Sequence, residues 1–424
     1  MFIKKRKRIL LLFIFLFAAT CFAVCSKEKS GPQKLSQTKE TKAMLSEELA
    51  QTEERQKHTL KSGHNFYLGS KPIGEITKIT FTNTAPEAFE ESWYANKTDS
   101  SEIVGYRNGA EIYIVGDKIY TSSDSSYMFG ARDNLGGQLW VNLQEINGLE
   151  HLDTSHTGYF QGMFYQNPHI KKLDIADWDL SNAVDISFMF SQCTALEELD
   201  VSRWDVGKVR DFTGLFQGNS NSGDMKFQEL DVSNWDTSSA TRMGHVFYGC
   251  AQLEELDVAN WDVSKVKTFT HIFADCYSLR DIDVSKWSTS SVESFDAMFN
   301  DCRSFAVLDV SGLDTSTCRQ FSQMFESCKN LTKIIGLENF DTSNASYYAF
   351  SEMFHNCPAL KELNLSSFNT SKADNMARMF AKCTSLENLD IGHFDISNVK
   401  YFSEMFKEVD ARDFILPSQM LEKI

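Results

Sequence analysis

The chain has 424 residues, a formal net charge of −16 and a composition that is ordinary apart from 33 Phe and 14 Met. The only basic block lies in the first eight residues. This excludes the nucleic-acid-binding class, because such proteins need a basic surface for the phosphates. A chain of this length is expected to form about two to four domains unless it is built from repeats.

Residues 1–24 have the pattern of a signal peptide. A basic start (MFIKKRKR) is followed by sixteen apolar residues at 9–24, and polar sequence begins at Ser26. Because a membrane-spanning helix needs roughly 20 apolar residues, cleavage is favoured over an uncleaved anchor. The protein is therefore expected to be exported.

Two cysteines, Cys21 and Cys25, could carry the lipid of a bacterial lipoprotein. Cys25 is favoured because the polar sequence starts directly after it. Thr20 and Val24 depart from the small residue usual before such a cysteine, so secretion without lipid stays open. Residues 25–62 are rich in Lys, Glu, Gln, Ser and Thr, which predicts a disordered or transiently helical tether. A lipid at the N-terminus would be the only membrane attachment.

Residues 63–140 are predicted to form a small β cap. Apolar and polar residues alternate at 75–83, 102–108 and 110–122, which predicts antiparallel strands with a hairpin near Gly116 and Asp117. Such a cap would cover the exposed core and strand edge at the first repeat.

The rest of the chain is periodic. One phenylalanine recurs with a spacing of 26 residues, interrupted by spacings of 35, 31 and 29. A fixed period of this size indicates stacked structural repeats. The recurring phenylalanines are Phe129, Phe164, Phe190, Phe216, Phe247, Phe273, Phe299, Phe325, Phe354, Phe380 and Phe406.

Each repeat is predicted to hold one strand and one short helix. In residues 253–258 (LEELDV) apolar positions alternate around Asp257, whereas residues 262–273 (DVSKVKTFTHIF) offer a serine N-cap and apolar residues at helical spacing. Neither element can bury its apolar side alone, so neighbours are expected to stack. The prediction is an α/β solenoid of about ten coils over residues 141–416, with parallel strands on one face, short helices on the other and a C-terminal tail at 417–424.

Two further columns follow the same frame. A column of Trp, Leu and Phe is assigned to the core, at the corner after the strand. A position that accepts Leu and Phe requires a large apolar side chain and not the indole N–H. A sugar- or partner-binding aromatic strip is the alternative. The cysteines three residues after the recurring phenylalanine are interpreted as small buried residues, with disulfides between coils as the alternative. The aromatic column comprises Trp178, Trp204, Trp235, Trp261, Trp287, Leu313, Phe340, Phe368 and Phe394.

Catalytic and metal-binding motifs are not recognised in the sequence. It has no GxSxG, HExxH, phosphate-binding loop or dinucleotide fingerprint. His245 and His271 share a slot in neighbouring repeats but lack a third ligand, so they are interpreted as solvated surface. We therefore expect no enzyme activity, no metal site and no cofactor.

An aspartate recurs at the outward strand position between two buried residues, as at Asp231, Asp257 and Asp283. Parallel stacking would place successive carboxylates about 4.8 Å apart, and such like charges need compensation. Hydrogen bonds from neighbouring serine and backbone groups are the structural explanation, and a divalent cation or a basic partner is the functional one. The predicted ligand-binding strand face comprises Asp231, Asp257, Asp283, Glu229, Glu255 and Asp281.

The repeated pattern, as in residues 230–250 (LDVSNWDTSSATRMGHVFYGC), resembles the BspA-like bacterial surface proteins with leucine-rich repeats. The resemblance covers residues 65–416. It implies a leucine-rich-repeat horseshoe, a cell-surface or secreted location and adhesion to host or neighbouring-cell macromolecules. This chain departs from the pattern by replacing Trp with Leu or Phe from 313 to 394 and by insertions at 217–226 and 334–353.

These observations predict an exported binding protein that takes a protein or glycan ligand through its repeats. The ligand is expected to be basic or bridged by a divalent cation, and nucleic acid is not expected as a partner. A passive envelope protein without a specific ligand is the alternative.

Overall fold

The computed structural model describes residues 33–132, 135–218, 225–410 and 412–421. The predicted signal peptide and Cys25 lie outside the described residues. The chain divides into two compact units, Met1–Arg55 and Gln56–Ile424. None of the helices within the described ranges combines the length and hydropathy needed to cross a membrane.

Most of the predicted tether is helical. Helix α2 spans Gln33–Lys57, and its side chains from 46 to 54 are all exposed. Most of the 25 residues of this helix are polar, which agrees with the exposure of that stretch.

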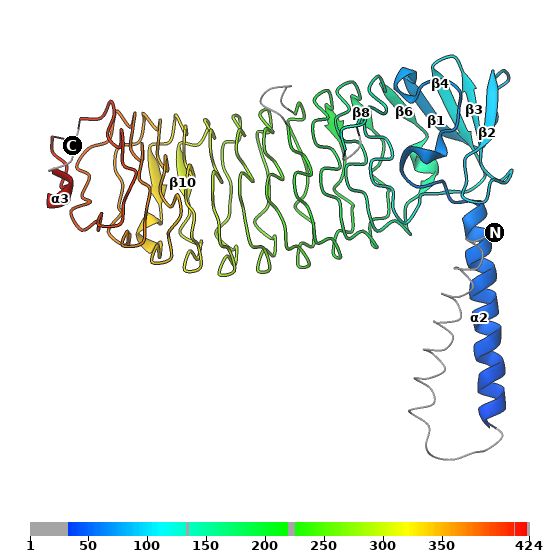
Figure 1. The fold of residues 1–424 in the computed structure, drawn as a ribbon, viewed down its shortest axis with the longest axis horizontal. Coiled ribbons are helices and arrows are strands. Elements are labelled where there is room, and N and C mark those ends of the chain that lie inside the picture. Colours follow the sequence, from blue (N-terminus) through cyan, green and yellow to red (C-terminus); the bar gives the residue numbers. More distant parts are fainter. Residues whose placement is uncertain (1–32, 133–134, 219–224, 411, 422–424) are drawn as a thin grey trace. The chain divides into compact units, whose positions relative to one another are not determined.

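The second unit begins with a five-stranded sheet, labelled at one end of Figure 1. The strand order is β2-β3-β4-β1-β6, in which β2-β3-β4 is antiparallel and β1 runs parallel to both β4 and β6. Two short 3₁₀-helices, η1 (Gly63–Phe66) and η2 (Ile73–Glu75), precede it. The strands are β1 (Lys78–Thr82), β2 (Glu91–Tyr94), β3 (Val104–Asn108), β4 (Glu111–Val115) and β6 (Glu145–Asn147).

The predicted hairpin near Gly116 and Asp117 is wrong. The hairpin joins β3 to β4 through Gly109, whose φ of 61° suits a tight turn. After β4 the chain leaves this sheet, and β5 (Ile119–Tyr120) pairs in parallel with β7 (Leu152–Asp153).

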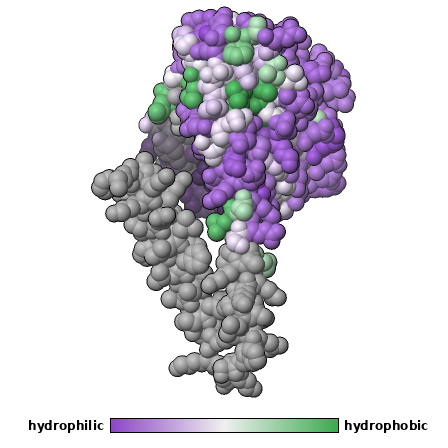
Figure 2. All heavy atoms as spheres, turned by 90° about the vertical axis from the view of Figure 1, so that its right-hand side faces the viewer, coloured by the Kyte–Doolittle hydropathy of each residue, from purple (hydrophilic) through white to green (hydrophobic). Residues whose placement is uncertain are grey.

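The sheet packs its inner face on the repeat core. Alternate residues of β1 and β4, such as Phe81 and Ile114, are buried. The Phe81 ring lies 5.9 Å from the ring of Phe129, the first recurring phenylalanine. The outer surface at this end is mostly hydrophilic, with small hydrophobic areas (Figure 2). The sheet therefore closes this end of the core.

Successive repeats are joined through parallel backbone pairing. Pairs of strands link neighbouring repeats in two places, and single bridges such as Glu229 with Glu255 link others. The strands are only two or three residues long, and the repeats follow one another as narrow loops in Figure 1. These strands are β8 (Lys172–Leu173), β9 (Glu198–Leu199), β10 (Val307–Asp309) and β11 (Lys333–Ile335).

The predicted α/β solenoid, a leucine-rich-repeat horseshoe with a helical face, is wrong. Within the described residues the repeats contain only the 3₁₀-helices η3 (Leu149–His151) and η4 (Leu337–Asn339), and the four-residue α3 (Ser418–Leu421) follows them. The segment 262–273, predicted as helix, consists of turns. The predicted strand face is likewise reduced to isolated bridges over most of the chain.

Backbone hydrogen bonds explain why this segment is not helical. In a helix the Phe273 N–H would bond within its own turn, but here it donates to Met298 O of the next repeat at 3.1 Å. His271 and Asp275 likewise donate to the next repeat, and both have positive φ values of 55° and 59°. Such left-handed residues end a helix. The segment is therefore a series of tight turns held by its neighbour.

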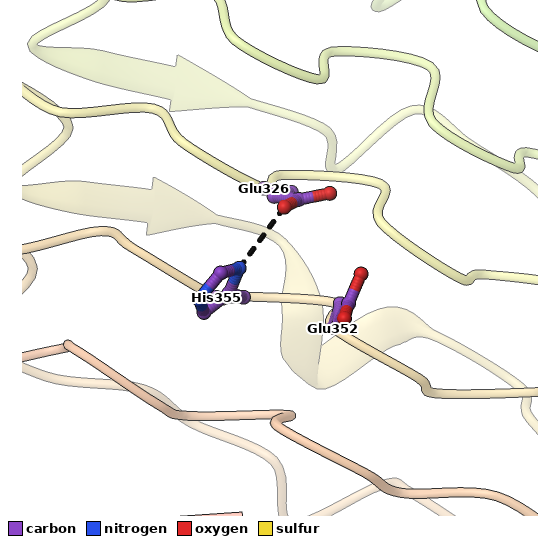
Figure 3. Close-up of side chains that lie close together, drawn as sticks. All are labelled: Glu326, Glu352 and His355. Carbon is purple, nitrogen blue, oxygen red and sulfur yellow. Dashed lines mark hydrogen bonds and ion pairs between the residues drawn. The ribbon is translucent and has the colours of Figure 1, made fainter. Parts of the chain in front are cut away.

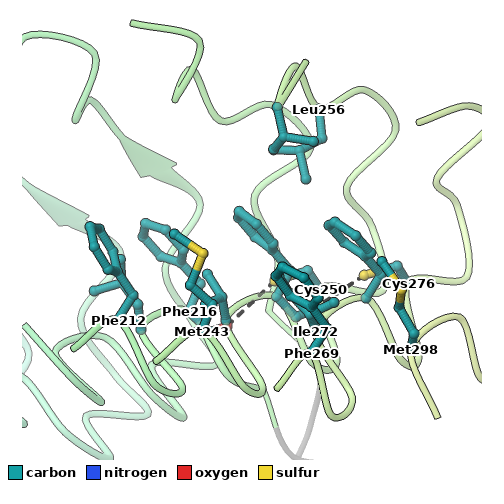
Figure 4. Close-up of a cluster of buried hydrophobic side chains, with 14 of the residues drawn as sticks. Phe212, Phe216, Met243, Cys250, Leu256, Phe269, Ile272, Cys276 and Met298 are labelled. Atoms are coloured by element: carbon teal, nitrogen blue, oxygen red, sulfur yellow. Dashed lines mark hydrogen bonds between the residues drawn. The ribbon is translucent and has the colours of Figure 1, made fainter. Parts of the chain in front are cut away.

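The recurring phenylalanines form the central column of the core. Phe273 is fully buried, and its ring stacks on those of Phe247 at 5.8 Å and Phe299 at 5.7 Å. A second row is formed by the large residues four positions earlier, and Figure 4 shows Phe212, Met243 and Phe269 along it.

The tryptophans are also core residues, as predicted. Trp261 is 3% exposed and stacks in parallel between Trp235 at 6.2 Å and Trp287 at 6.5 Å, which leaves no face for a sugar. However, the slot uses the indole N–H as well as bulk, because Trp261 Nε1 donates to Val232 O of the preceding repeat at 3.2 Å. Where Phe368 occupies the slot, the hydroxyl of the adjacent Ser367 donates to Leu337 O instead.

The interpretation of the cysteines as small buried residues is confirmed. All eight cysteines in the described ranges are buried and free of disulfides. Cys302 Sγ donates to Phe273 O of the preceding repeat at 3.1 Å, and six others in the same slot make the equivalent bond. Each thiol thus adds a hydrogen bond between neighbouring repeats, and in the case of Phe273 the carbonyl also accepts the Cys276 N–H.

Candidate functional sites

The predicted acidic strip lies on three consecutive repeats. All six of its side chains are exposed, and the apolar residues between them, such as Leu230 and Leu256, are buried. The parallel bridge between Glu229 and Glu255 sets the two repeats in register. We keep the name acidic strip for Glu229, Asp231, Glu255, Asp257, Asp281 and Asp283.

The three aspartates that the recurring frame places in the strip cap the turn that follows them. Asp231 Oδ1 accepts the Ser233 N–H at 3.1 Å and the Ser233 hydroxyl at 2.7 Å. Asp257 Oδ1 accepts the Ala259 N–H at 3.1 Å, and Asp283 Oδ1 accepts the Ser285 N–H at 2.9 Å. This is the structural role that the repeat pattern suggested, since Asp favours such turns. It occupies one oxygen of each carboxylate.

The negative charge of the strip is only weakly compensated. Within the described ranges none of its six carboxylates forms an ion pair, and the nearby Arg280 pairs with Glu254 instead, at 2.7 Å. The pKa of Asp283 is lowered, chiefly because Ser285 donates hydrogen bonds to it and in smaller part because Lys286 is near. Asp283 is therefore ionised at neutral pH.

A hollow of about 560 Å³ borders the strip. It places Lys226 among acidic and amide groups, so one basic side chain lies at the edge of the acidic surface. The hollow is lined by Glu197, Glu198, Lys226, Gln228, Glu229 and Gln252.

A second polar surface runs beside the recurring phenylalanines, in the slots two residues before and one residue after them. From Asn300 to Lys407 the side chains in these slots bond to one another across successive repeats. We call this set the polar ladder. It comprises Asn300, Gln323, Glu326, Glu352, His355, Arg378, Glu404 and Lys407.

Three members of the polar ladder converge (Figure 3). His355 Nδ1 lies 2.9 Å from Glu326 Oε1, and Glu352 lies beside them. The sequence motifs predict no metal site, so this group was not expected. Its signal was visible, because Glu326 and His355 occupy the same slot of neighbouring repeats, as His245 and His271 do.

His245 and His271 are half-buried, so their interpretation as solvated surface is wrong. Their rings stack at 4.9 Å, and Tyr248 meets both edge-on. The buried Nδ1 of each ring has no hydrogen-bond partner. Burial, together with the neighbouring His271, lowers the pKa of His245 to about 4, and burial lowers that of His271. The pair is therefore neutral at pH 7.

Comparisons with known proteins identify a family. The chain matches the family described as "Mycoplasma protein of unknown function, DUF285" over residues 126–222, 219–336 and 332–419. A search of curated proteins gives no match. The solved structure of the functional domain of InlJ from Listeria monocytogenes, which includes a cysteine ladder, is 15% identical with a TM-score of 0.26; the alignment covers 70% of this chain and 57% of that one. Because the three matched segments together span more than half of the chain, this repeat protein belongs to the DUF285 family.

Proposed function

We propose that the chain is an exported bacterial surface protein that binds a macromolecular ligand through the acidic strip. The signal-peptide pattern of residues 1–24 supports export, and the resemblance to BspA-like surface proteins supports adhesion. The ligand is a protein or glycan that presents basic groups or is bridged by a divalent cation. The role is binding without catalysis.

The observation that carries the proposal is the exposure of six neighbouring carboxylates on three successive repeats. A core-forming role would bury these side chains, and turn capping uses only one oxygen of each aspartate. The oxygens left over face solvent in a row, which is the arrangement that attracts an extended basic partner. A passive envelope protein, the alternative, needs no such row.

The proposed attachment to the membrane is a lipid on Cys25. Detergent-phase partitioning of membranes from expressing cells tests it directly. The wild-type protein should enter the detergent phase, and Cys25→Ala should release it into the aqueous fraction or the medium. Aqueous behaviour of the wild type would contradict lipidation, whereas release by Cys21→Ala alone would move the site to Cys21.

Binding through the strip is tested by removing its charge without its shape. The triple variant Asp231→Asn, Asp257→Asn and Asp283→Asn keeps an oxygen that can accept the capping N–H groups, so its stability should be close to that of the wild type. Its binding to an immobilised basic polypeptide, polylysine, should weaken. The salt dependence of that binding should also flatten.

A matched control removes the same charge from a different turn of three successive repeats, two of which also carry the strip. Asp205, Asp236 and Asp262 are exposed and cap their turns in the same way, at 3.0 to 3.1 Å from the capping N–H. Their triple Asn variant should bind polylysine like the wild type. Equal weakening in both triple variants would mean that binding follows net charge alone, which would refute the strip and favour the passive envelope role.

A further inference from the structure

We propose that Glu326, Glu352 and His355 form a binding site for a divalent transition-metal ion, with Zn²⁺ as the best match. The site is separate from the acidic strip and lies in the polar ladder. Its function does not depend on the ligand proposed above.

The backbone holds the three side chains together. The His355 N–H donates to Glu352 O at 3.0 Å, which closes a tight turn and places both side chains on one side. Glu326 comes from the preceding repeat. The backbone N–H groups of its neighbours Phe325 and Ser327 donate to Met353 O at 3.0 Å and to His355 O at 2.8 Å, which fixes the register of the two repeats. The donors are therefore positioned by the core and not by a free loop.

The donor atoms are close to the separation that an ion requires. One donor atom from each of Glu326, Glu352 and His355 lies within 4.8 Å of the other two. Donors around a tetrahedral Zn²⁺, at about 2.0 to 2.2 Å from the ion, lie roughly 3.3 to 3.6 Å apart. Small rotations of the side chains close that difference, and a water molecule would complete the four ligands.

Neighbouring side chains hold the carboxylates as they are held in known metal sites. Asn300 Nδ2 donates to Glu326 Oε2 at 2.9 Å, and Arg378 Nη1 donates to Glu352 Oε1 at 3.0 Å. These bonds orient one oxygen of each carboxylate and leave Glu326 Oε1 facing His355 Nδ1. Partners of this kind fix ligand geometry in metal sites.

Gln323 provides a fourth group. Its Nε2 donates to Glu326 Oε2 at 2.6 Å and to Glu352 Oε2 at 2.9 Å, so the amide bridges the two carboxylates. With an ion between the carboxylates, a flipped amide would offer its oxygen to the ion. The same side chain can thus serve the free and the metal-bound state.

Burial and charge favour a cation at this place. The side chains of Glu326, Glu352 and His355 are only 15%, 21% and 19% exposed. The guanidinium of Arg378 pairs with Glu352 but is shared with Glu404, so the positive charge near the two carboxylates of the site is limited. Because a carboxylate that loses water needs positive charge nearby, a divalent ion would stabilise the ionised pair.

The ligand set selects the class of metal. Imidazole nitrogen with two carboxylates suits Zn²⁺, whereas Ca²⁺ takes six to eight oxygen ligands and Mg²⁺ keeps most of its waters. The pair His245 and His271 is a weaker candidate for binding the ion, because no third donor joins the pair within the described residues. Metal binding must replace the hydrogen bond between His355 Nδ1 and Glu326 Oε1.

Calorimetric titration of the full chain in detergent with Zn²⁺ alone tests the site. The wild type should bind one equivalent of Zn²⁺. The affinity for that equivalent should be about tenfold or more weaker in each of the variants Glu326→Gln, Glu352→Gln and His355→Gln. Ca²⁺ and Mg²⁺ should not compete for it. Thermal unfolding serves as a second readout, because Zn²⁺ should raise the Tm of the wild type and not that of the variants.

Two control variants make the result specific. Glu404→Gln removes a carboxylate from the same face, and His271→Gln breaks the stacked histidine pair; neither should change the Zn²⁺ equivalent. Any Zn²⁺ bound by Cys21 or Cys25 would be present equally in the wild type and in all variants, so it would not change the comparison. The proposal is overturned if the wild type binds more weakly than about 1 mM, if the ligand variants match the wild type, or if Glu404→Gln weakens binding as much.

Discussion

Replacing Phe273 by Ala tests whether the stacked phenylalanine column holds the repeats together. The side chain is fully buried, stacks on Phe247 and Phe299, and lies 6.1 Å from the Trp287 ring. Removing a buried phenylalanine costs about 3 to 5 kcal/mol. The loss should fall in the upper part of that range, because each stacked pair adds about 0.5 to 1.5 kcal/mol.

Phe406→Ala is the matched control, because Phe406 occupies the same slot at the end of the column. It is only partly buried, stacks on Phe380 at 5.6 Å and meets Phe414 edge-on. With a repeat on one side only, its removal should cost less than half as much as the loss of Phe273.

Urea unfolding followed by tryptophan fluorescence measures both variants, since Trp261 and Trp287 report on the surrounding repeats. The m-values should be compared as well, because an unchanged m shows that the same surface unfolds. A loss below about 1 kcal/mol for Phe273→Ala, or equal losses for both variants, would refute the role of the column as the main support of the stack.

Three further predictions concern the other columns. Trp261→Phe should lower the free energy of unfolding by about 0.5 to 1.5 kcal/mol in urea, because the Val232 carbonyl keeps the Trp235 N–H but loses the indole donor; an unchanged value would mean that bulk alone matters. Maleimide labelling and peptide mapping should leave Cys302 unmodified until unfolding, since burial raises its pKa well above the usual value, and rapid labelling in the folded protein would disprove this. The free energy of unfolding should fall as the pH drops from 6.5 towards 4, because the unfolded chain protonates His245 while the folded state keeps it neutral. That contribution is roughly 1 to 2 kcal/mol after screening at a partly exposed site, and His245→Gln should reduce it; an equal fall in this variant would assign the effect to other groups.

The repeat period and the buried columns could be predicted from the sequence. Phenylalanine, tryptophan and cysteine return every 26 residues, and large apolar or thiol side chains at equivalent positions are buried together because water excludes them. The places of Phe273, Trp261 and Cys302 in the core follow from that chemistry alone. The exposed positions of Asp231 and Asp257 follow in the same way, from their alternation with buried leucine and valine.

The backbone conformation could not be predicted in the same way. Apolar residues at helical spacing also fit a series of tight turns, and periodicity alone cannot separate the two. The choice depends on where the N–H of Phe273 and of its neighbours donate, and those acceptors lie 25 residues away in the next repeat. Positive φ at His271 and Asp275 is tolerated only once that neighbour is in place.

The sequence by itself therefore determined which residues are buried, because burial depends on each side chain's own affinity for water. Only the tertiary structure decided which polar side chains meet. Glu326, Glu352 and His355 come together because stacking in register brings two repeats side by side, and His245 loses water for the same reason. Such contacts arise between residues that are distant along the chain, so their geometry exists only after the repeats have packed.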